Sequence, residues 1–424
     1  MKRHLQAIGT AATSILLALS MAVVPAIAVK AEDITLRLPS WWFGEPGNEI
    51  WMNQVVQDFM DANPGIKVDG YNLPYGSYAD QMLMEMSSGT PPDVIHLTNL
   101  NIGDYLRNDL LLPLDEFMAE SDISAETFTP AQFASPIVTD GQTYGVIHMV
   151  ANYIPFYNAD LLAEAGFEEF PDNPADFLAM AQALSNPPES FGYAAMVKPG
   201  SYVETYMDVA QWVIAGGGSF AVDGKPTINA PANIAAIEQF KSLFDAGVMP
   251  RDVDKSTYRQ MWWQGKVAVL FDGSWMMGFA RAENPDITPK LRTALMPWPG
   301  HLTASAFQIW SVPRGAPNPE AAFKLIEFMQ SPEQQVKMVS ITNTVSPRFG
   351  SLPEGYLDEN PWFHSFQEAS DKYAVSIMPE GLEAYGNEIL KIIADKIELI
   401  LYRDADIEAS LNEAQSEVEA LISG

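Results

Sequence analysis

Between residues 34 and 98 the spacing of apolar side chains switches repeatedly between two periods, which restricts the fold to a narrow class. Short stretches with the pattern of β-strands lie at Ile34–Leu38, Ile66–Val68 and Asp93–Leu97. Longer stretches with the spacing of amphipathic helices separate them, at Asn48–Ala62 and Tyr78–Ser87. A strand–helix–strand–helix–strand order is typical of an α/β domain, so we expect a largely parallel sheet here.

The rest of the chain continues this mixture of helices and strands. Residues 158–246 are predicted to be mostly helical, and Gly265–Phe271 is an apolar run expected to form a strand buried on both faces. A helix is predicted over Pro319–Met329, with proline in its first turn, and a second one begins after the capping residues Gln330–Glu333. The tail from Ala384 to Ile422 has helical periodicity throughout.

The first residues have the composition of a secretory signal peptide. A positively charged start precedes the uncharged apolar run Ala7–Val24, and Ala28 or Ala31 ends a small-residue cleavage site, so we expect residues 1–28 to be removed. The sequence has no cysteine, so neither disulfides nor the lipid anchor of a bacterial lipoprotein is available. This predicts a freely diffusing periplasmic protein. No later apolar run is long enough to span a bilayer, so stable membrane insertion is not expected.

Size and charge limit the architecture and the partners. The mature chain is too long for one hydrophobic core and suits two lobes. The formal charge is −30, and the loss of Lys2 and Arg3 with the signal peptide makes it −32. A dispersed negative charge of this size repels nucleic acids and anionic lipid surfaces, so we expect neither as a partner.

Motifs for catalysis and cofactor binding are mostly absent. The five histidines are scattered without zinc-site spacing, and there is no Walker loop, no cysteine nucleophile and no serine-hydrolase elbow. Gly216–Gly218 follows a predicted helix and is interpreted as its C-terminal cap. We expect no cofactor and no metal. Carboxylates are numerous enough for a glycosidase pair, so a secreted carbohydrate hydrolase is the alternative from a different class.

Aromatic and small polar residues follow the ends of three predicted strands. In sheets of this class, ligands bind beyond the carboxyl ends of the strands. The residues at these positions are Ser40–Trp42, Thr98–Asn101 and Gly273–Trp275. A flat indole can lie against the apolar face of a sugar ring while amides and hydroxyls bind the ring hydroxyls, so these sets predict a carbohydrate site. Trp262 and Trp263 precede their strand and are interpreted as packing residues.

Five segments match the pattern of a known family in its order. They are Phe59–Val68, Ser88–Val94, Tyr144–Leu162, Gly265–Trp275 and Asn318–Gln334. Together they resemble the extracellular solute-binding proteins of family 1, which serve ABC importers of sugars and include the maltose-binding protein group. The chain departs from the family pattern at Ile147, where a proline is expected. Leu100 and Asn101 replace the charged contacts of maltose-type members, so maltodextrin specificity is not implied.

The resemblance implies an α/β fold of the two-lobe periplasmic-binding-protein type (type II), with the ligand in the inter-lobe cleft. It places three hinge crossings near His148–Asn152, Pro299–Thr303 and Thr344–Pro347. Each lobe is then discontinuous in sequence. The N-terminal lobe would comprise residues 29–148 and 303–344, and the C-terminal lobe residues 149–302 and 345–424.

The implied function is binding of a neutral mono- or oligosaccharide or a polyol by lobe closure, then delivery to an ABC permease, without catalysis. The ligand-binding residues expected from the strand ends and the resemblance are Ser40, Trp41, Trp42, Glu45, Thr98, Asn99, Asn101, Asn152, Tyr202, Gly273, Trp275, Phe307, Arg348 and Tyr385. A phosphorylated polyol bound with help from Arg348, or another small polar solute, is the alternative ligand. We expect the protein to be a monomer. A chemoreceptor that binds the ligand-loaded form is an alternative partner to the permease.

Overall fold

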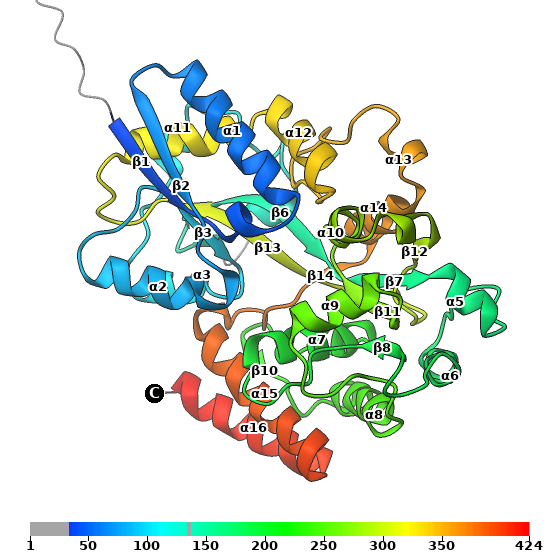
Figure 1. The fold of residues 1–424 in the computed structure, drawn as a ribbon. Coiled ribbons are helices and arrows are strands. Elements are labelled where there is room, and N and C mark those ends of the chain that lie inside the picture. The colour runs from blue at the N-terminus through cyan, green and yellow to red at the C-terminus, as the bar shows by residue number, and fades with distance from the viewer. Residues whose placement is uncertain (1–33, 134–136, 424) are drawn as a thin grey trace, which may run out of the picture.

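A computed structural model describes residues 34–133 and 137–423, and it has two lobes joined by long central strands (Figure 1). The predicted signal peptide lies outside these residues. The strands are β1 (Ile34–Pro39), β2 (Ile66–Tyr71), β3 (Ile95–Thr98), β4 (Val138–Thr139), β5 (Gln142–Thr143), β6 (Val146–Asn152), β7 (Ile154–Asn158), β8 (Phe191–Ala194), β9 (Ala221–Val222), β10 (Lys225–Pro226), β11 (Val267–Asp272), β12 (Leu291–Thr293), β13 (Thr303–Ser311) and β14 (Ala374–Ser376).

The α-helices are α1 (Asn48–Ala62), α2 (Tyr75–Ser87), α3 (Ile102–Arg107), α4 (Asp115–Met118), α5 (Ala159–Glu164), α6 (Pro174–Ala183), α7 (Tyr202–Ala215), α8 (Pro231–Asp245), α9 (Lys255–Trp263), α10 (Met276–Glu283), α11 (Pro319–Met329), α12 (Pro332–Thr342), α13 (Tyr356–Glu359), α14 (His364–Lys372), α15 (Gly386–Arg403) and α16 (Ile407–Ser423). Short 3-10 helices, among them η1 (Trp41–Gly44) and η5 (Glu383–Tyr385), complete the fold. Across the part of the chain that is described, no helix has the length and apolar character needed to cross a bilayer.

The first lobe contains β1, β2 and β3 with α1, α2, α3, α11 and α12 (Figure 1). β1 and β2 pair in parallel from their first residues, Ile34 and Ile66, to their last. Helix α1 presents Trp51, Val55 and Phe59, which are spaced by one turn and fully buried. The predicted strand and helix order is therefore confirmed.

The expectation of a largely parallel sheet is wrong for β3. This strand pairs antiparallel with β13, for example Leu97 with Ile309. Its link to β1 is made by the amides of Asp93 and Val94, which both donate to the carbonyl of Arg37. The reason is that β13, which has no counterpart among the predicted strands, comes from a distant part of the chain and inserts beside β3.

The second lobe is built on a four-stranded sheet in the order β12–β7–β11–β8. Every residue of β11 is buried, and the strand lies between β7, which is antiparallel to it, and β8, which is parallel. The prediction of a strand buried on both faces is confirmed. Helices α6, α7, α8 and α9 pack around this sheet, and Trp262 of α9 is fully buried against Phe156, as its interpretation as a packing residue requires.

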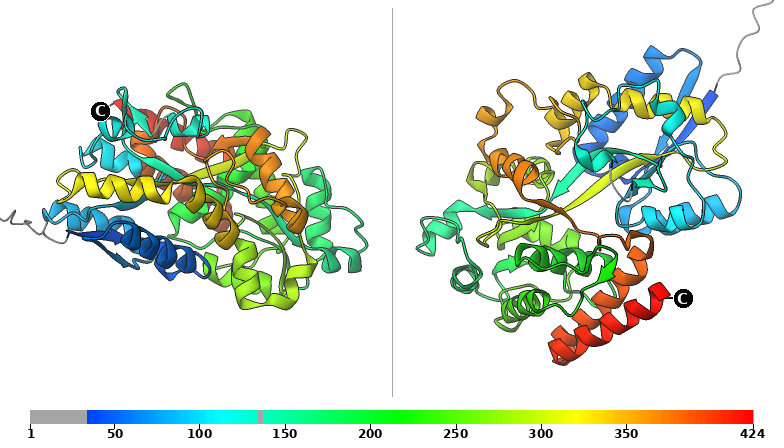
Figure 2. Two further views of the ribbon diagram at one scale, coloured as in Figure 1. Left: turned by 90° about the horizontal axis from the view of Figure 1, so that it is seen from above. Right: turned by 180° about the vertical axis from the view of Figure 1, so that it is seen from behind.

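β6 and β13 run between the lobes, as the view from behind in Figure 2 shows. They pair antiparallel, and β6 leads through Tyr153 directly into β7 of the second lobe. Val345 bridges to Val150 of β6, and β14 pairs in parallel with the first residues of β13. The chain therefore returns to β13 at Ala374–Ser376, beyond the last predicted crossing, in a segment predicted to belong to the C-terminal lobe. The residue boundaries of the two lobes are kept as a proposal.

The predicted helical tail consists of two helices. α15 ends where Asp404 adopts a left-handed backbone conformation with φ of 54°, and α16 then packs back on α15 and α8. Figure 2 shows both helices, coloured orange-red to red, on the second lobe. Helix α7 also packs on α15, so the tail forms part of the core of this lobe.

Close backbone packing of β8 on α6 gives the first test. A Cβ atom at Gly192 would lie 2.0 Å from the carbonyl oxygen of Ala181. We expect Gly192→Ala to lower the free energy of unfolding by about 1–3 kcal/mol, because one of the two backbones has to shift. Gly76→Ala is the control, since no atom lies within 4 Å of its added Cβ. Urea unfolding measures both variants, and an unchanged stability of Gly192→Ala would contradict this packing.

Candidate ligand-binding cleft

A cavity of about 940 Å³ lies between the two lobes and the hinge strands. Its walls include Trp41, Trp42, Glu45 and Thr98 from the first lobe, Tyr153, Phe307 and Gln308 from the hinge, and Glu204, Lys255, Arg259 and Trp275 from the second lobe. A second cavity of about 1060 Å³ shares Trp41, Tyr75, Thr98 and Glu204 with the first. We call the two together the cleft. Its walls come from both lobes, so a ligand inside it would contact both.

Trp41 is held in place by the end of β1. Ser40 has an extended backbone, and its hydroxyl accepts a hydrogen bond from the amide of Trp42 at 3.1 Å, which starts the η1 turn. The turn places the indole of Trp41 parallel to the imidazole of His96, with ring centroids 3.6 Å apart. Tyr75 contacts the same indole edge-on. These contacts fix the orientation of the indole before any ligand arrives.

The sequence analysis considered histidines only as metal ligands and missed the role of two of them. His96 and His148 are fully buried, and their Nε2 atoms are 2.7 Å apart. Burial lowers the pKa of both imidazoles well below the usual value, and the neighbouring His148 lowers that of His96 further. The pair is therefore neutral at physiological pH and acts as flat packing beneath Trp41. No cluster of metal-ligating side chains occurs among the described residues.

Trp275 reaches the cleft from the end of β11. It is partly exposed, and its indole meets the ring of Tyr153 edge-on at 6.1 Å. A Cβ atom on Gly273 would lie 2.0 Å from the Trp275 ring, so this indole position requires glycine there. Gly273 itself does not line the cavity, which makes it a support for the ring rather than a ligand contact.

The side-chain oxygen of Gln308 and two buried donor groups on the cleft wall have no hydrogen-bond partner. The two donors are the indole N–H of Trp42 and the hydroxyl of Thr98, in side chains that are 0% and 4% exposed. Other buried tryptophans, such as Trp310, also lack a partner for the N–H group, but they do not line the cleft. A buried polar group without a partner is costly, so these two groups favour a ligand or water that offers hydroxyls.

The second lobe contributes charged residues that the sequence analysis did not identify. Lys255 and Arg259 lie one turn apart on α9, and both line the cleft. Arg259 binds Asp272 through Nε and Nη2 at 2.7 and 2.8 Å, and Lys255 binds Asp208 at 2.7 Å. Their spacing on one face of the helix before the central strand is the only signal that could have indicated them.

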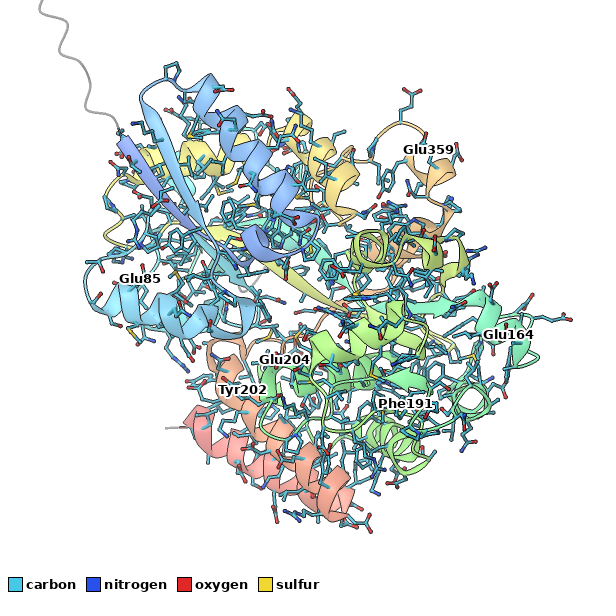
Figure 3. All side chains as sticks on the ribbon, in the orientation of Figure 1. Glu85, Glu164, Phe191, Tyr202, Glu204 and Glu359 are labelled. Carbon is cyan, nitrogen blue, oxygen red and sulfur yellow. The ribbon has the colours of Figure 1, made fainter. Side chains whose placement is uncertain are left out.

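Glu45, which the sequence analysis included, lines the cleft at the end of η1. Burial raises the pKa of its carboxyl to about 7, and a hydrogen bond from the Asn48 amide and the charge of Arg259 oppose the rise only in part. Glu204 faces the same cavities from the first turn of α7. Figure 3 places Tyr202 and Glu204 on the side of the second lobe that is turned toward the first.

The other residues predicted from the sequence lie in the main cavity, in the adjoining cavity, or buried behind the wall. Phe307 lines the main cavity, and Asn101 and Tyr202 line the adjoining one. Asn99 and Asn152 are buried behind the wall, where their side-chain oxygens accept hydrogen bonds from the amide of Phe307 and the hydroxyl of Ser305. They hold β13 rather than line the cavity. Ser40 likewise bonds inside the fold, to His96 at 2.8 Å.

Arg348 and Tyr385 are not brought to the cleft walls, which corrects their predicted placement. The guanidinium of Arg348 is bound by both carboxylate oxygens of Asp122, at 2.5 and 3.2 Å, and by the carbonyl of Gln330. It lines a separate pocket. The ring of Tyr385, in η5, lies beneath the guanidinium of Arg107 at 5.6 Å. Both side chains are thus engaged by partners that lie far away in the sequence.

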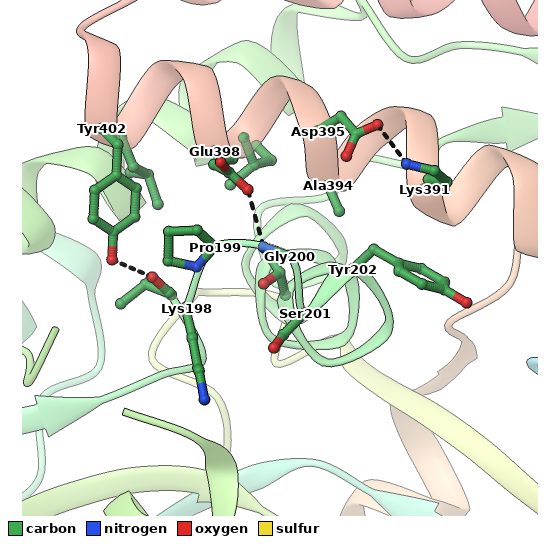
Figure 4. A pocket seen from close by; sticks show the side chains of 14 residues that line it. Lys198, Pro199, Gly200, Ser201, Tyr202, Lys391, Ala394, Asp395, Glu398 and Tyr402 are labelled. Carbon is green, nitrogen blue, oxygen red and sulfur yellow. Dashed lines mark hydrogen bonds and ion pairs between the residues drawn. The ribbon is translucent and has the colours of Figure 1, made fainter. Parts of the chain in front are cut away.

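A smaller pocket of about 410 Å³ lies behind the loop that supplies Tyr202 (Figure 4). In this pocket the amide of Gly200 donates to the carboxylate of Glu398 in α15 at 3.1 Å. Tyr402 of the same helix donates to the carbonyl of Val197. The tail helix therefore anchors the loop at the entrance to α7, which positions Glu204 in the cleft.

The fold and the cleft define a two-lobe binding protein, and comparison with known proteins identifies the family. Residues 45–336 match the family described as bacterial extracellular solute-binding protein. The chain therefore belongs to this family, whose members are binding proteins rather than enzymes.

Individual relatives are similar at low identity. A putative binding protein of Brucella abortus is 22% identical over 383 residues, which cover 88% of this chain and 90% of that protein. An ABC transporter solute-binding protein of Thermotoga lettingae with bound α-D-tagatose has a TM-score of 0.81 at 20% identity, covering 91% of this chain and 98% of the other. A maltose-bound protein of T. maritima has a TM-score of 0.81 at 19% identity, covering 92% and 100%. These structures confirm the predicted two-lobe fold.

The raised pKa of Glu45 makes stability depend on pH in a defined direction. A carboxyl with a pKa of about 7 when folded binds its proton more tightly in the folded than in the unfolded chain, so its stabilisation is lost as pH rises toward and through this value. We expect Glu45→Gln to match the wild-type melting temperature at about pH 5 and to exceed it at about pH 8. Glu164→Gln, at an exposed position on α5, should show no such pH dependence. A constant difference between Glu45→Gln and wild type across this range would contradict the assignment.

Proposed function

We propose that the protein is the periplasmic substrate-binding component of an ABC importer and that its cleft binds a neutral mono- or oligosaccharide or a polyol. The observation that carries this proposal is the pair of buried, unpartnered groups on Trp42 and Thr98 beside the indole of Trp41. Aromatic rings suit the apolar faces of a sugar ring, and the two polar groups suit its hydroxyls. Relatives with bound tagatose and maltose add support.

Binding by lobe closure follows from where the aromatic residues lie. Trp41 comes from the first lobe and Trp275 from the second, so a ligand between them is held fully only when the lobes approach. The closed form would then dock on the permease as a monomer. The predicted signal peptide and the absence of cysteine support a free periplasmic protein rather than a lipoprotein.

The two alternatives make different predictions in solution. A phosphorylated polyol would need a free cation, but Arg348 is bound to Asp122, and the cleft cations are bound to Asp272 and Asp208. A carbohydrate hydrolase would release product continuously from an oligosaccharide. A thermal-shift screen of sugars, polyols and sugar phosphates, followed by a product assay on each hit, separates the three. Stabilisation by sugar phosphates alone, or sustained turnover, would contradict the proposal.

Removing the unpartnered N–H group of Trp42 tests the observation on which the proposed function rests. We expect Trp42→Phe to weaken binding of the best sugar from that screen by about 1–3 kcal/mol, because the variant keeps the ring but loses the N–H group. Trp42→Phe should also lose some stability, because a smaller ring replaces a fully buried indole, and Trp310→Phe should lose a similar amount for the same reason. Trp310→Phe removes an equally buried, unpartnered N–H outside the cleft and should leave affinity unchanged. Calorimetric titration measures both, and equal affinities of the two variants would overturn the role of Trp42.

Trp275 gives an independent test of the second lobe's contribution. Because its side chain is only partly buried, Trp275→Ala should cost less than the roughly 3–5 kcal/mol typical of a fully buried aromatic residue. Its effect on sugar affinity should be large, since aromatic anchors dominate binding energy. Melting temperature and affinity are measured on the same variant. A large loss of stability with unchanged affinity would make Trp275 a core residue and remove it from the site.

A further inference from the structure

The cations in the cleft are already neutralised by carboxylates behind them. The carboxylate of Asp272, which is fully buried, receives two hydrogen bonds from Arg259, and that of Asp208, only 3% exposed, binds the ammonium of Lys255. Asp208 is held further by the hydroxyl of Tyr258 at 3.0 Å. Each pair is close to neutral as seen from the cavity, and separating it would leave an unpaired buried carboxylate.

Two other carboxylates face the cleft without a cation of their own. Glu45 receives a hydrogen bond from the amide of Asn48 at 2.9 Å, and across the described residues neither Glu45 nor Glu204 forms an ion pair. Burial raises the pKa of the Tyr75 hydroxyl, and the negative charges of Glu204 and Glu45 raise it further, so both carboxylates lie near the same ring. With the two ion pairs neutral, Glu204 and the ionised fraction of Glu45, whose pKa is about 7, give the cleft an excess of negative charge near neutral pH.

The same cavities hold groups that need a partner from outside the protein. Thr98, whose hydroxyl is unpartnered and whose side chain is 4% exposed, lines both cavities together with Trp41, Tyr75 and Glu204. Aromatic rings beside carboxylates form a favourable environment for a cationic group, through the negative ring faces and the carboxylate charge together. The carboxylates and the unpartnered hydroxyl therefore belong to one ligand site.

We propose that the cleft selects a saccharide that carries a basic nitrogen, an amino sugar, and discriminates against acidic sugars. This inference rests on the sugar-binding function proposed above. An ammonium group would supply the cation that Glu45 and Glu204 lack, while ring hydroxyls pair with Trp42 and Thr98. A carboxylate or phosphate would enter a site of the same sign, and Arg259 could receive it only by loosening its bonds to Asp272.

Matched sugars that differ only in charge test this selectivity. The probes are glucosamine, glucose and glucuronic acid, the corresponding galactose series, and deacetylated chitobiose against cellobiose. In calorimetric titrations near neutral pH and low salt, we expect the amino sugar of the recognised series to bind at least about tenfold more tightly than its neutral counterpart. The acidic sugar should bind most weakly, and added salt should reduce the differences.

Carboxylate variants identify the groups responsible. Glu45→Gln combined with Glu204→Gln should abolish the preference, so that the amino sugar and its neutral counterpart bind this variant with equal affinity. Glu164→Gln on α5 is the control and should keep the full preference. A thermal melt shows that each variant is folded before titration.

Each outcome bears on one of the two proposals. Neutral sugars that bind as tightly as amino sugars, or a preference that survives the double variant, overturn the charge selectivity and leave the sugar-binding function standing. An acidic sugar that binds most tightly also overturns the selectivity. If no sugar, polyol or amino sugar binds, the sugar-binding function fails, and the selectivity that rests on it fails as well.

Discussion

The hydrogen bonding of β13 is the constraint on which both lobes depend. This one strand pairs with β3 of the first lobe, with β6 that leads into the second, and with β14 that precedes the tail helices. Its Trp310 is fully buried against His96 and His148, so the strand also closes the aromatic layer under the cleft. Because the passages between lobes run beside one strand, rotation about that strand disturbs few hydrogen bonds, whereas sliding of the lobes would break the pairing.

The walls of the cleft show how a cavity with charged residues can remain ordered. A guanidinium or ammonium group set among aromatic rings without a counter-ion would lose hydration worth several kcal/mol. The buried carboxylates of Asp272 and Asp208 remove that cost and hold Arg259 and Lys255 in fixed positions. On the other wall, the neutral imidazole of His96 holds Trp41 by stacking. The ligand therefore meets side chains whose rotamers are already fixed, which reduces the entropy lost on binding.

The sequence predicts those parts of the fold that depend on local periodicity. The alternation of β1, α1, β2, α2 and β3, the buried strand β11 and the helix α11 follow from the spacing of apolar residues within short windows. The partner of β3 does not, because residues that meet across this junction, such as Asn99 and Phe307, are separated by 208 positions. No local pattern specifies a pairing at that distance, so the sheet was expected to be more parallel than it is.

The same distinction applies to the cleft. Trp41, Trp42 and Trp275 are found from the rule that ligands bind beyond strand ends, and the structure brings all three to one cavity. Arg348 is predicted to lie at the cleft but does not line it, because Asp122, 226 residues away in the sequence, binds its guanidinium elsewhere. His96 escapes notice because its role is to stack beneath another residue, and nothing in its flanking sequence indicates that neighbour.

A substitution at Gly273 would change the shape of the cleft indirectly. The indole of Trp275 occupies the space in which any other side chain at this position would begin. A single methyl group there would force the indole out of its present position without altering a residue of the cavity wall. Mutation of Gly273, in evolution or in the laboratory, can therefore alter ligand preference, although Gly273 is not among the residues that line the cavity. Libraries intended to retune the specificity should include the positions beneath the rings as well as the rings themselves.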